Sequence, residues 1–110
     1  MNLAAIRRHA MALPEVTEEP HHEFTSFRVR GKIFVTVPPD EQYIHIFTSE
    51  QQREEALDRH PEFLEELHWG RKVVGLRASL REAKASALQA LIDAAWRFKA
   101  PKSLVARERS

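Results

Sequence analysis

The sequence contains no cysteine, and this absence excludes several classes of protein. Disulfide bonds, thiol nucleophiles and thiolate metal sites all require that residue, so the fold must be stabilised by packing alone. A chain without cysteine is compatible with a reducing compartment, and we therefore expect a cytoplasmic protein.

Glycine is scarce, with three residues that stand alone at positions 31, 70 and 75. This spacing excludes a glycine-rich phosphate loop. The chain also has no serine in a nucleophile-elbow pattern and no His-Glu-x-x-His helix. A general acid–base pair such as His45 with Glu23 stays open, because no spacing favours or opposes it. We expect no catalytic residues, no cofactor and a protein that is not an enzyme.

Long hydrophobic runs are absent as well. No stretch approaches the roughly 18 apolar residues that a membrane-spanning helix needs. Residues 1–9 are amphipathic and soon interrupted by charge, so we expect neither a signal peptide nor a membrane partner. The length of 110 residues suits one core, and we predict a single soluble domain over residues 1–110, with a monomer favoured.

The charge that is present is divided unevenly along the chain. Residues 15–66 hold thirteen acids against five lysines and arginines, whereas residues 67–110 hold ten lysines and arginines against three acids. Such a division is typical of a basic binding face, or of two halves of a domain that attract each other. Both interpretations stay open at this point.

Hydrophobic periodicity predicts an α+β fold. Residues 14–22 are expected to be an acidic connection. The predicted elements are a helix at 3–13, strands at 24–30, 32–37 and 42–47, a helix from Thr48 or Ser49 to about 59, a short helix at 62–67, a strand at 72–80 and a helix at 82–99. The order α-β-β-β-α-α-β-α indicates a two-layer sandwich, in which helices pack on one face of an antiparallel sheet.

The first predicted hairpin has a strongly basic tip. Gly31 supplies the positive φ that a tight turn requires. Arg28, Arg30 and Lys32 surround it, a charge density suited to resting against a phosphate backbone. Solubilising charges on an ordinary surface hairpin would give the same pattern.

Residues 68–76 join the acidic half of the chain to the basic half. We expect Trp69 to be a buried apolar anchor, whose truncation to alanine would cost about 3–5 kcal/mol. Gly75 either makes room for a large neighbour or marks a bulge. Arg71, Lys72 and Arg77 are the cations of this stretch that could add to the basic hairpin.

Two regions have some metal-like character. In the sequence His21-His22-Glu23, only His21 and Glu23 would share one face of an extended segment, whereas a transition-metal site needs three or four converging ligands. Residues 50–66 carry an acidic ridge, which is also typical of a solvated helix face. We predict no metal ligands in either region.

In its motifs the chain resembles the MmcQ/YjbR-like family of small bacterial proteins over nearly its whole length. The resemblance begins at residues 13–18 and continues through the F-x-V-x-G-K-x-F pattern of residues 27–34. It takes in His68-Trp69-Gly70 and ends with residues 94–97 and 100–102. It implies a CyaY-like fold and a DNA-binding function inferred largely from the shape of a "double wing" surface.

The leading hypothesis from sequence is therefore a DNA-binding module. The candidate phosphate contacts are Arg28, Arg30, Lys32, Arg71, Lys72 and Arg77. One alternative is a metal-binding protein, because the CyaY-like fold is shared with iron-binding frataxins. Another is a protein-interaction or small-ligand module that uses the sheet face around Tyr43, His45 and Trp69.

Overall fold

The computed structural model describes residues 1–108. Its elements are α1 (Leu3–Met11), β1 (Val16–His21), β2 (Phe24–Val29), β3 (Lys32–Val37), β4 (Tyr43–Ile46), α2 (Glu50–Arg59), β5 (Leu64–Trp69), β6 (Lys72–Ser79), α3 (Ala85–Lys99) and α4 (Lys102–Glu108). In this part of the chain no helix is both long and apolar enough to cross a membrane.

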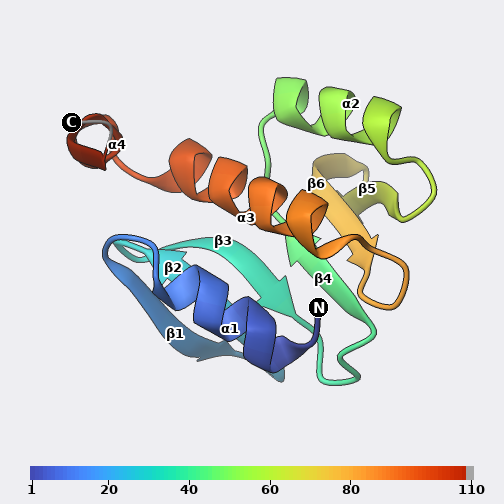
Figure 1. Cartoon of the computed structure of the whole chain (residues 1–110), viewed down its shortest axis with the longest axis horizontal. Helices are drawn as coiled ribbons and strands as arrows, with labels where there is room; N and C mark the ends of the chain where they lie inside the picture. Colours follow the sequence, from blue (N-terminus) through green and yellow to red (C-terminus); the bar gives the residue numbers. More distant parts are fainter. Residues whose placement is uncertain (109–110) are drawn as a thin grey trace.

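Six antiparallel strands form one layer in the order β1-β2-β3-β4-β6-β5. Helices α1 and α3 cover one face of this sheet, and α2 packs beside β5 and β6 (Figure 1). The predicted α+β sandwich of an antiparallel sheet with helices on one face is thereby confirmed. The predicted strand 72–80 is β6, which lies inside the sheet between β4 and β5.

The core forms where α3 lies against the sheet. Leu88, Ile92 and Trp96 recur on one helical face, and all three side chains are buried. They meet buried strand residues such as Phe34 and Ile44. The apolar face predicted for the last helix is confirmed, although the helix begins at Ala85 rather than at residue 82.

The predicted connection at residues 14–22 is wrong, because residues 16–21 form the edge strand β1. Only Val16 of this strand is buried, so its sequence lacks the alternation that would reveal it. Its outward acids and Pro20 suit an edge, since proline removes one backbone donor and charges discourage pairing with another chain.

The short helix predicted at residues 62–67 is also wrong, because residues 64–69 form β5 at the other edge. Leu64 and Leu67 are both buried, and their spacing of three residues imitates a helix. In a strand this spacing places them on opposite faces. Leu64 joins the main core, while Leu67 lines a groove on the other side.

Candidate functional site

Two basic hairpins of similar construction lie on the side of the sheet that α1 and α3 do not cover. Val29 pairs with Lys32 in the β2–β3 hairpin and Trp69 pairs with Lys72 in the β5–β6 hairpin, so each turn contains two residues. Gly31 has a φ of 82° and Gly70 a φ of 59°, which turns of this length require. Each hairpin therefore begins its returning strand with a lysine.

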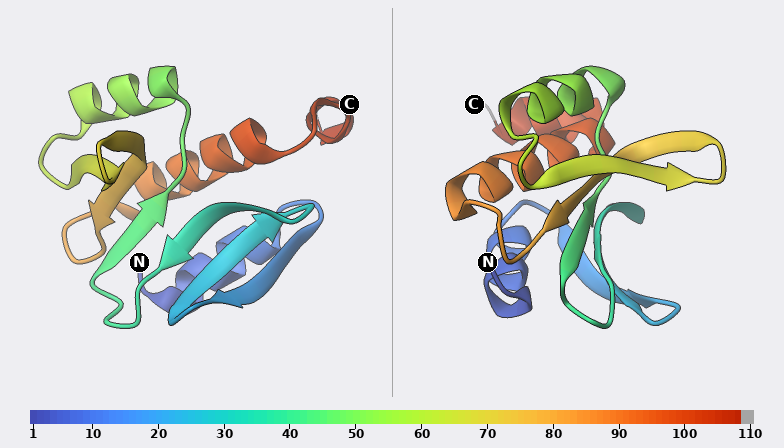
Figure 2. Two further views of the ribbon diagram at one scale, coloured as in Figure 1. Left: turned by 180° about the vertical axis from the view of Figure 1, so that it is seen from behind. Right: turned by 90° about the vertical axis from the view of Figure 1, so that its right-hand side faces the viewer.

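Both returning strands contain a bulge close to the turn. The pairing register skips Phe34 in β3 and Val74 in β6. An extra residue bends a strand and increases its twist. The β5–β6 hairpin and the β1–β2–β3 strands project away from α1 and α3, as the right-hand view of Figure 2 shows.

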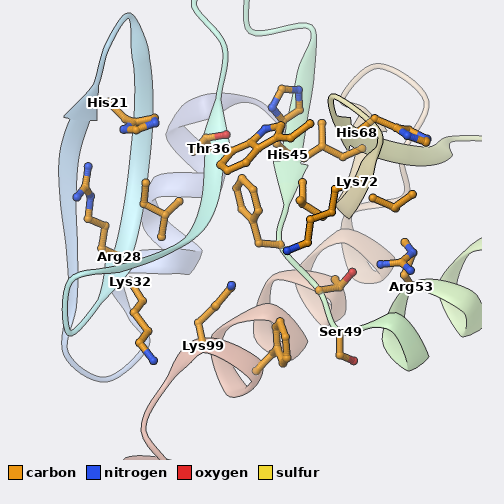
Figure 3. Close-up of a pocket in the computed structure, with 18 of the residues that line it drawn as sticks. His21, Arg28, Lys32, Thr36, His45, Ser49, Arg53, His68, Lys72 and Lys99 are labelled. Atoms are coloured by element: carbon orange, nitrogen blue, oxygen red, sulfur yellow. The ribbon is translucent and has the colours of Figure 1, made fainter.

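A groove of about 1010 Å³ lies between these two parts of the sheet (Figure 3). Its walls come from β2, β3 and the β5–β6 hairpin, and β4 with the beginning of α2 and the end of α3 completes it. Strands far apart in the sequence thus share one concave surface. We call it the hairpin groove.

The hairpin groove has an excess of positive charge. Among residues 1–108, its lining contains the five cations Arg28, Lys32, Arg53, Lys72 and Lys99 and the single acid Glu50. The other acids of the 50–66 ridge do not line it. Because a concave surface of low polarisability focuses a field, this excess makes the groove a favourable place for an anion.

Three of the six cations predicted as a site, Arg28, Lys32 and Lys72, line the groove, and three do not. Arg30 donates to both carboxylate oxygens of Glu15, at 2.8 and 2.9 Å, and this hydrogen bonding raises the pKa of Arg30. Arg71 is exposed in the turn of the second hairpin.

Arg77 is held by neighbours on its own sheet. Its guanidinium donates to Glu65 and stacks 3.5 Å from the centre of the Tyr43 ring. Arg53 and Lys99, which sequence patterns missed, enter the groove from α2 and α3. No local signal marks them, since only the tertiary fold brings these helix residues to the sheet.

Aromatic surface accompanies the charge. Trp69 is 60% exposed, so the prediction that it is a buried anchor is wrong. It ends β5, where the chain turns back at once, and its ring packs edge to face with the Phe47 ring, at 5.7 Å between centroids. Phe98, which is 47% exposed, also lines the groove, with the Lys99 ammonium 5.0 Å from its ring centre.

His45 lies half-buried on β4 at the floor of the groove. Its ring is 5.8 Å from that of Phe24. Burial lowers the pKa of His45 below its ordinary value of 6.5, and the charge of Arg77 lowers it further, while Asp40 opposes this. The folded protein therefore favours a neutral ring.

This lowered pKa predicts a pH dependence of stability. Below pH 6.5 the unfolded chain binds a proton at His45 more readily than the folded protein, so the free energy of unfolding should fall as the pH drops through this window. Urea unfolding at about pH 7.5 and pH 5.5 should show a smaller loss for His45→Gln than for the natural protein. An equal loss in both proteins would show that His45 does not couple folding to pH.

The alternative of a metal-binding protein has no support from the geometry of residues 1–108. In this part of the chain no group of three His, Asp or Glu side chains is placed to hold a metal ion. His21 and His22 meet edge to face at 4.8 Å between ring centroids and both line the groove. They add polar, ring-bearing surface to its outer end.

Comparisons with known proteins agree on the family and the fold. A family model described as YjbR matches residues 11–98. The crystal structure of a Deinococcus radiodurans protein with a domain described as DUF419 superposes with a TM-score of 0.78 at 18% identity, covering 98% of this chain and 85% of that one. No curated protein matches the sequence.

Proposed function

The chain belongs to the YjbR family, and we propose that it binds DNA through the hairpin groove, without catalysing a reaction. The observation that carries this proposal is the charge of the groove lining, where the described part of the chain contributes five lysines and arginines and one acid. Phosphate contacts from such residues supply most of the affinity of a protein for nucleic acid.

The ion pairs of the protein support this choice of surface. Several arginines outside the groove are paired with carboxylates: Arg7 pairs with Glu18 at 2.7 Å and Arg30 with Glu15 at 2.8 Å. Within residues 1–108, Lys32, Lys72 and Lys99 take part in no ion pair. Their charges remain available for phosphates.

Arg28 lines the groove but, unlike the three lysines, already has polar contacts within residues 1–108. Its guanidinium donates to the Ser26 hydroxyl at 3.2 Å and to the Pro20 carbonyl at 3.4 Å. The Glu19 carboxylate lies 3.9 Å away, too far for a hydrogen bond. These contacts orient the side chain along β2. We therefore expect Arg28 to help position the bound DNA strand rather than to supply most of the affinity.

The exposed aromatic rings favour single-stranded DNA over a duplex. Trp69 and Phe98 present ring surface to the same groove that holds the cations. Unpaired bases stack on such rings, whereas the bases of a duplex are already stacked on one another. We therefore propose that phosphates contact the lysines and that a base stacks on Trp69.

Anisotropy titrations with a single-stranded oligonucleotide of about 15 nucleotides test this proposal. Binding should weaken steeply between about 50 and 200 mM salt. The triple variant Lys32→Ala, Lys72→Ala, Lys99→Ala should bind about tenfold more weakly or worse, and its salt slope should be smaller by about 2, because each lost phosphate contact removes about 0.7 from the slope.

A matched control removes the same charge elsewhere. Arg81, Lys84 and Lys102 are exposed and do not line the groove. Their triple alanine variant has the same net charge as the groove variant and should retain most of the affinity. If the two triple variants bind alike, or if the natural protein does not bind at low salt, the proposal is wrong.

A further inference from the structure

A buried hydroxyl without a partner lies in the wall of the hairpin groove. Thr48 is 4% exposed, and its Oγ1 forms no hydrogen bond within residues 1–108. Thr48 also lines the groove. Buried hydroxyls in folded proteins almost always have a hydrogen-bond partner. We therefore expect the partner of the Thr48 hydroxyl to be a group that binds in the groove.

The helix α2 begins next to this hydroxyl. Ser49 is its N-cap, and a capping box uses the Ser49 N–H and the Gln52 N–H, which bond to Gln52 Oε1 at 3.0 Å and to Ser49 Oγ at 3.1 Å. The N–H groups of Glu50 and Gln51 have no partner inside the helix. They carry the partial positive charge of the helix end, which favours an anion.

Cations stand around the same end of the groove. Arg53 lies one turn along α2 from Ser49, and Figure 3 draws the Lys72 and Lys99 ammonium groups directed into the groove. None of these three cations forms an ion pair within the described residues. Glu50 is the one acid that the described residues bring to the lining, and its carboxylate opposes an anion.

An aromatic surface adjoins these polar groups. Phe47 directly precedes Thr48 and packs its ring against the exposed Trp69. A ligand with a base on Trp69 and a phosphate beside Thr48 would use both features. A terminal phosphomonoester suits the polar end better than an internal phosphodiester, because it carries about two charges and one more strong acceptor.

From this arrangement we propose that Thr48, the start of α2 and Arg53 form a subsite for the terminal phosphomonoester of a nucleotide. The inference rests on the proposed function of the same groove and sharpens it, since it assigns the groove a strand end. The phosphate accepts hydrogen bonds from the Thr48 hydroxyl and from the free N–H groups of α2. Two sources of this group are a 5′-phosphorylated strand and a free nucleoside 5′-monophosphate.

Anisotropy titrations with one oligonucleotide, labelled at its 3′ end and carrying either a 5′-phosphate or a 5′-hydroxyl, test the subsite. At about pH 8 the monoester is fully ionised. We expect the phosphorylated strand to bind about tenfold more tightly, and Glu50→Gln to increase this ratio. Thymidine 5′-monophosphate and thymidine, added as competitors, distinguish the sources: better competition by the monophosphate identifies the free nucleotide as a ligand, and equal competition restricts the subsite to strand ends.

Two variants of one residue test the placement. Thr48→Val keeps the shape of the side chain and removes the hydroxyl, so the affinity ratio should fall towards one; Thr48→Ser keeps the hydroxyl and should retain the ratio. Thermal unfolding of both variants shows that they are folded. Equal binding of the two strands by the natural protein overturns the subsite and leaves DNA binding standing, whereas the absence of binding by both strands overturns the proposed function itself. A ratio that persists in Thr48→Val overturns the role of Thr48.

Discussion

Replacing Trp96 with alanine is expected to lower the free energy of unfolding by about 3–5 kcal/mol, the range found for a buried tryptophan or phenylalanine. The Trp96 side chain is 2% exposed, and its indole Nε1 donates to the Pro14 carbonyl at 3.1 Å. Truncation would leave a cavity between α3 and its neighbours and would remove the donor from that carbonyl. Urea unfolding followed by far-UV circular dichroism measures the loss.

The other tryptophan provides the matched control. Trp69→Ala is the same substitution at a side chain that is 60% exposed, and it should cost about 1 kcal/mol or less. Its effect should instead appear in binding, where loss of a stacking ring is worth about 1–3 kcal/mol per base. Equal stability losses for the two variants would show that Trp69 is a core residue, as the sequence alone had indicated.

The strongest local signals predicted their elements well. The hairpin around Gly31 combines an alternating pattern on each side with the residue that a tight turn requires, and it forms as expected. The long helix α3 repeats apolar residues over four turns, so its buried face was readable. In both cases the information lies within one short segment of the chain.

The two edge strands could not be predicted from the sequence, for a physical reason. An edge strand buries little, so β1 shows one apolar residue among charges. In β5, Leu64 and Leu67 are buried on opposite faces by different surroundings, which produces a helical spacing without a helix. In both strands, tertiary packing determines which residues are buried. Tertiary packing also determines that Trp96 is buried and Trp69 is exposed.

The candidate site was half predictable. The density of cations in sequence identified Arg28, Lys32 and Lys72, which line the groove. It could not show that Glu15 pairs with Arg30, or Glu65 with Arg77, because those partners are 15 and 12 residues away. Nor could it show Arg53 and Lys99, whose helices reach the groove only after the sheet has formed.

Replacing Gly75 with alanine is expected to destabilise the protein by about 3 kcal/mol or more, at the upper end of the range for overpacking. A Cβ at this position would lie 2.2 Å from the Ile46 carbonyl oxygen and 3.0 Å from the Phe47 Cα. Both are backbone atoms, so no flexible side chain can move aside. The alternatives from sequence were space for a side chain or a bulge; Gly75 follows the bulge at Val74, and the group that needs the space is the backbone leaving β4.

A second glycine separates this clash from a general intolerance of substitution. Gly70 lies in the turn of the β5–β6 hairpin, with a φ of 59° and no atom of residues 1–108 within 4 Å of an added Cβ. Gly70→Asn should therefore cost only the strain of the positive φ, about 1 kcal/mol, because the added side chain meets no backbone atom. Urea midpoints for the two variants should differ widely, and a Gly75→Ala protein as stable as Gly70→Asn would disprove the close approach.

The crossing at Gly75 also bears on the groove. The Phe47 N–H donates to the Phe34 carbonyl of β3 at 3.0 Å, so the segment that passes over Gly75 ties β3 to β6. Thr48 and the start of α2 follow directly. If the Gly75→Ala protein folds at low temperature, the segment at Ile46–Phe47 must shift away from β6. This shift displaces Thr48 more than it displaces the hairpin lysines. We therefore expect the variant to lose more of its preference for a 5′-phosphate than of its affinity for a 5′-hydroxyl strand.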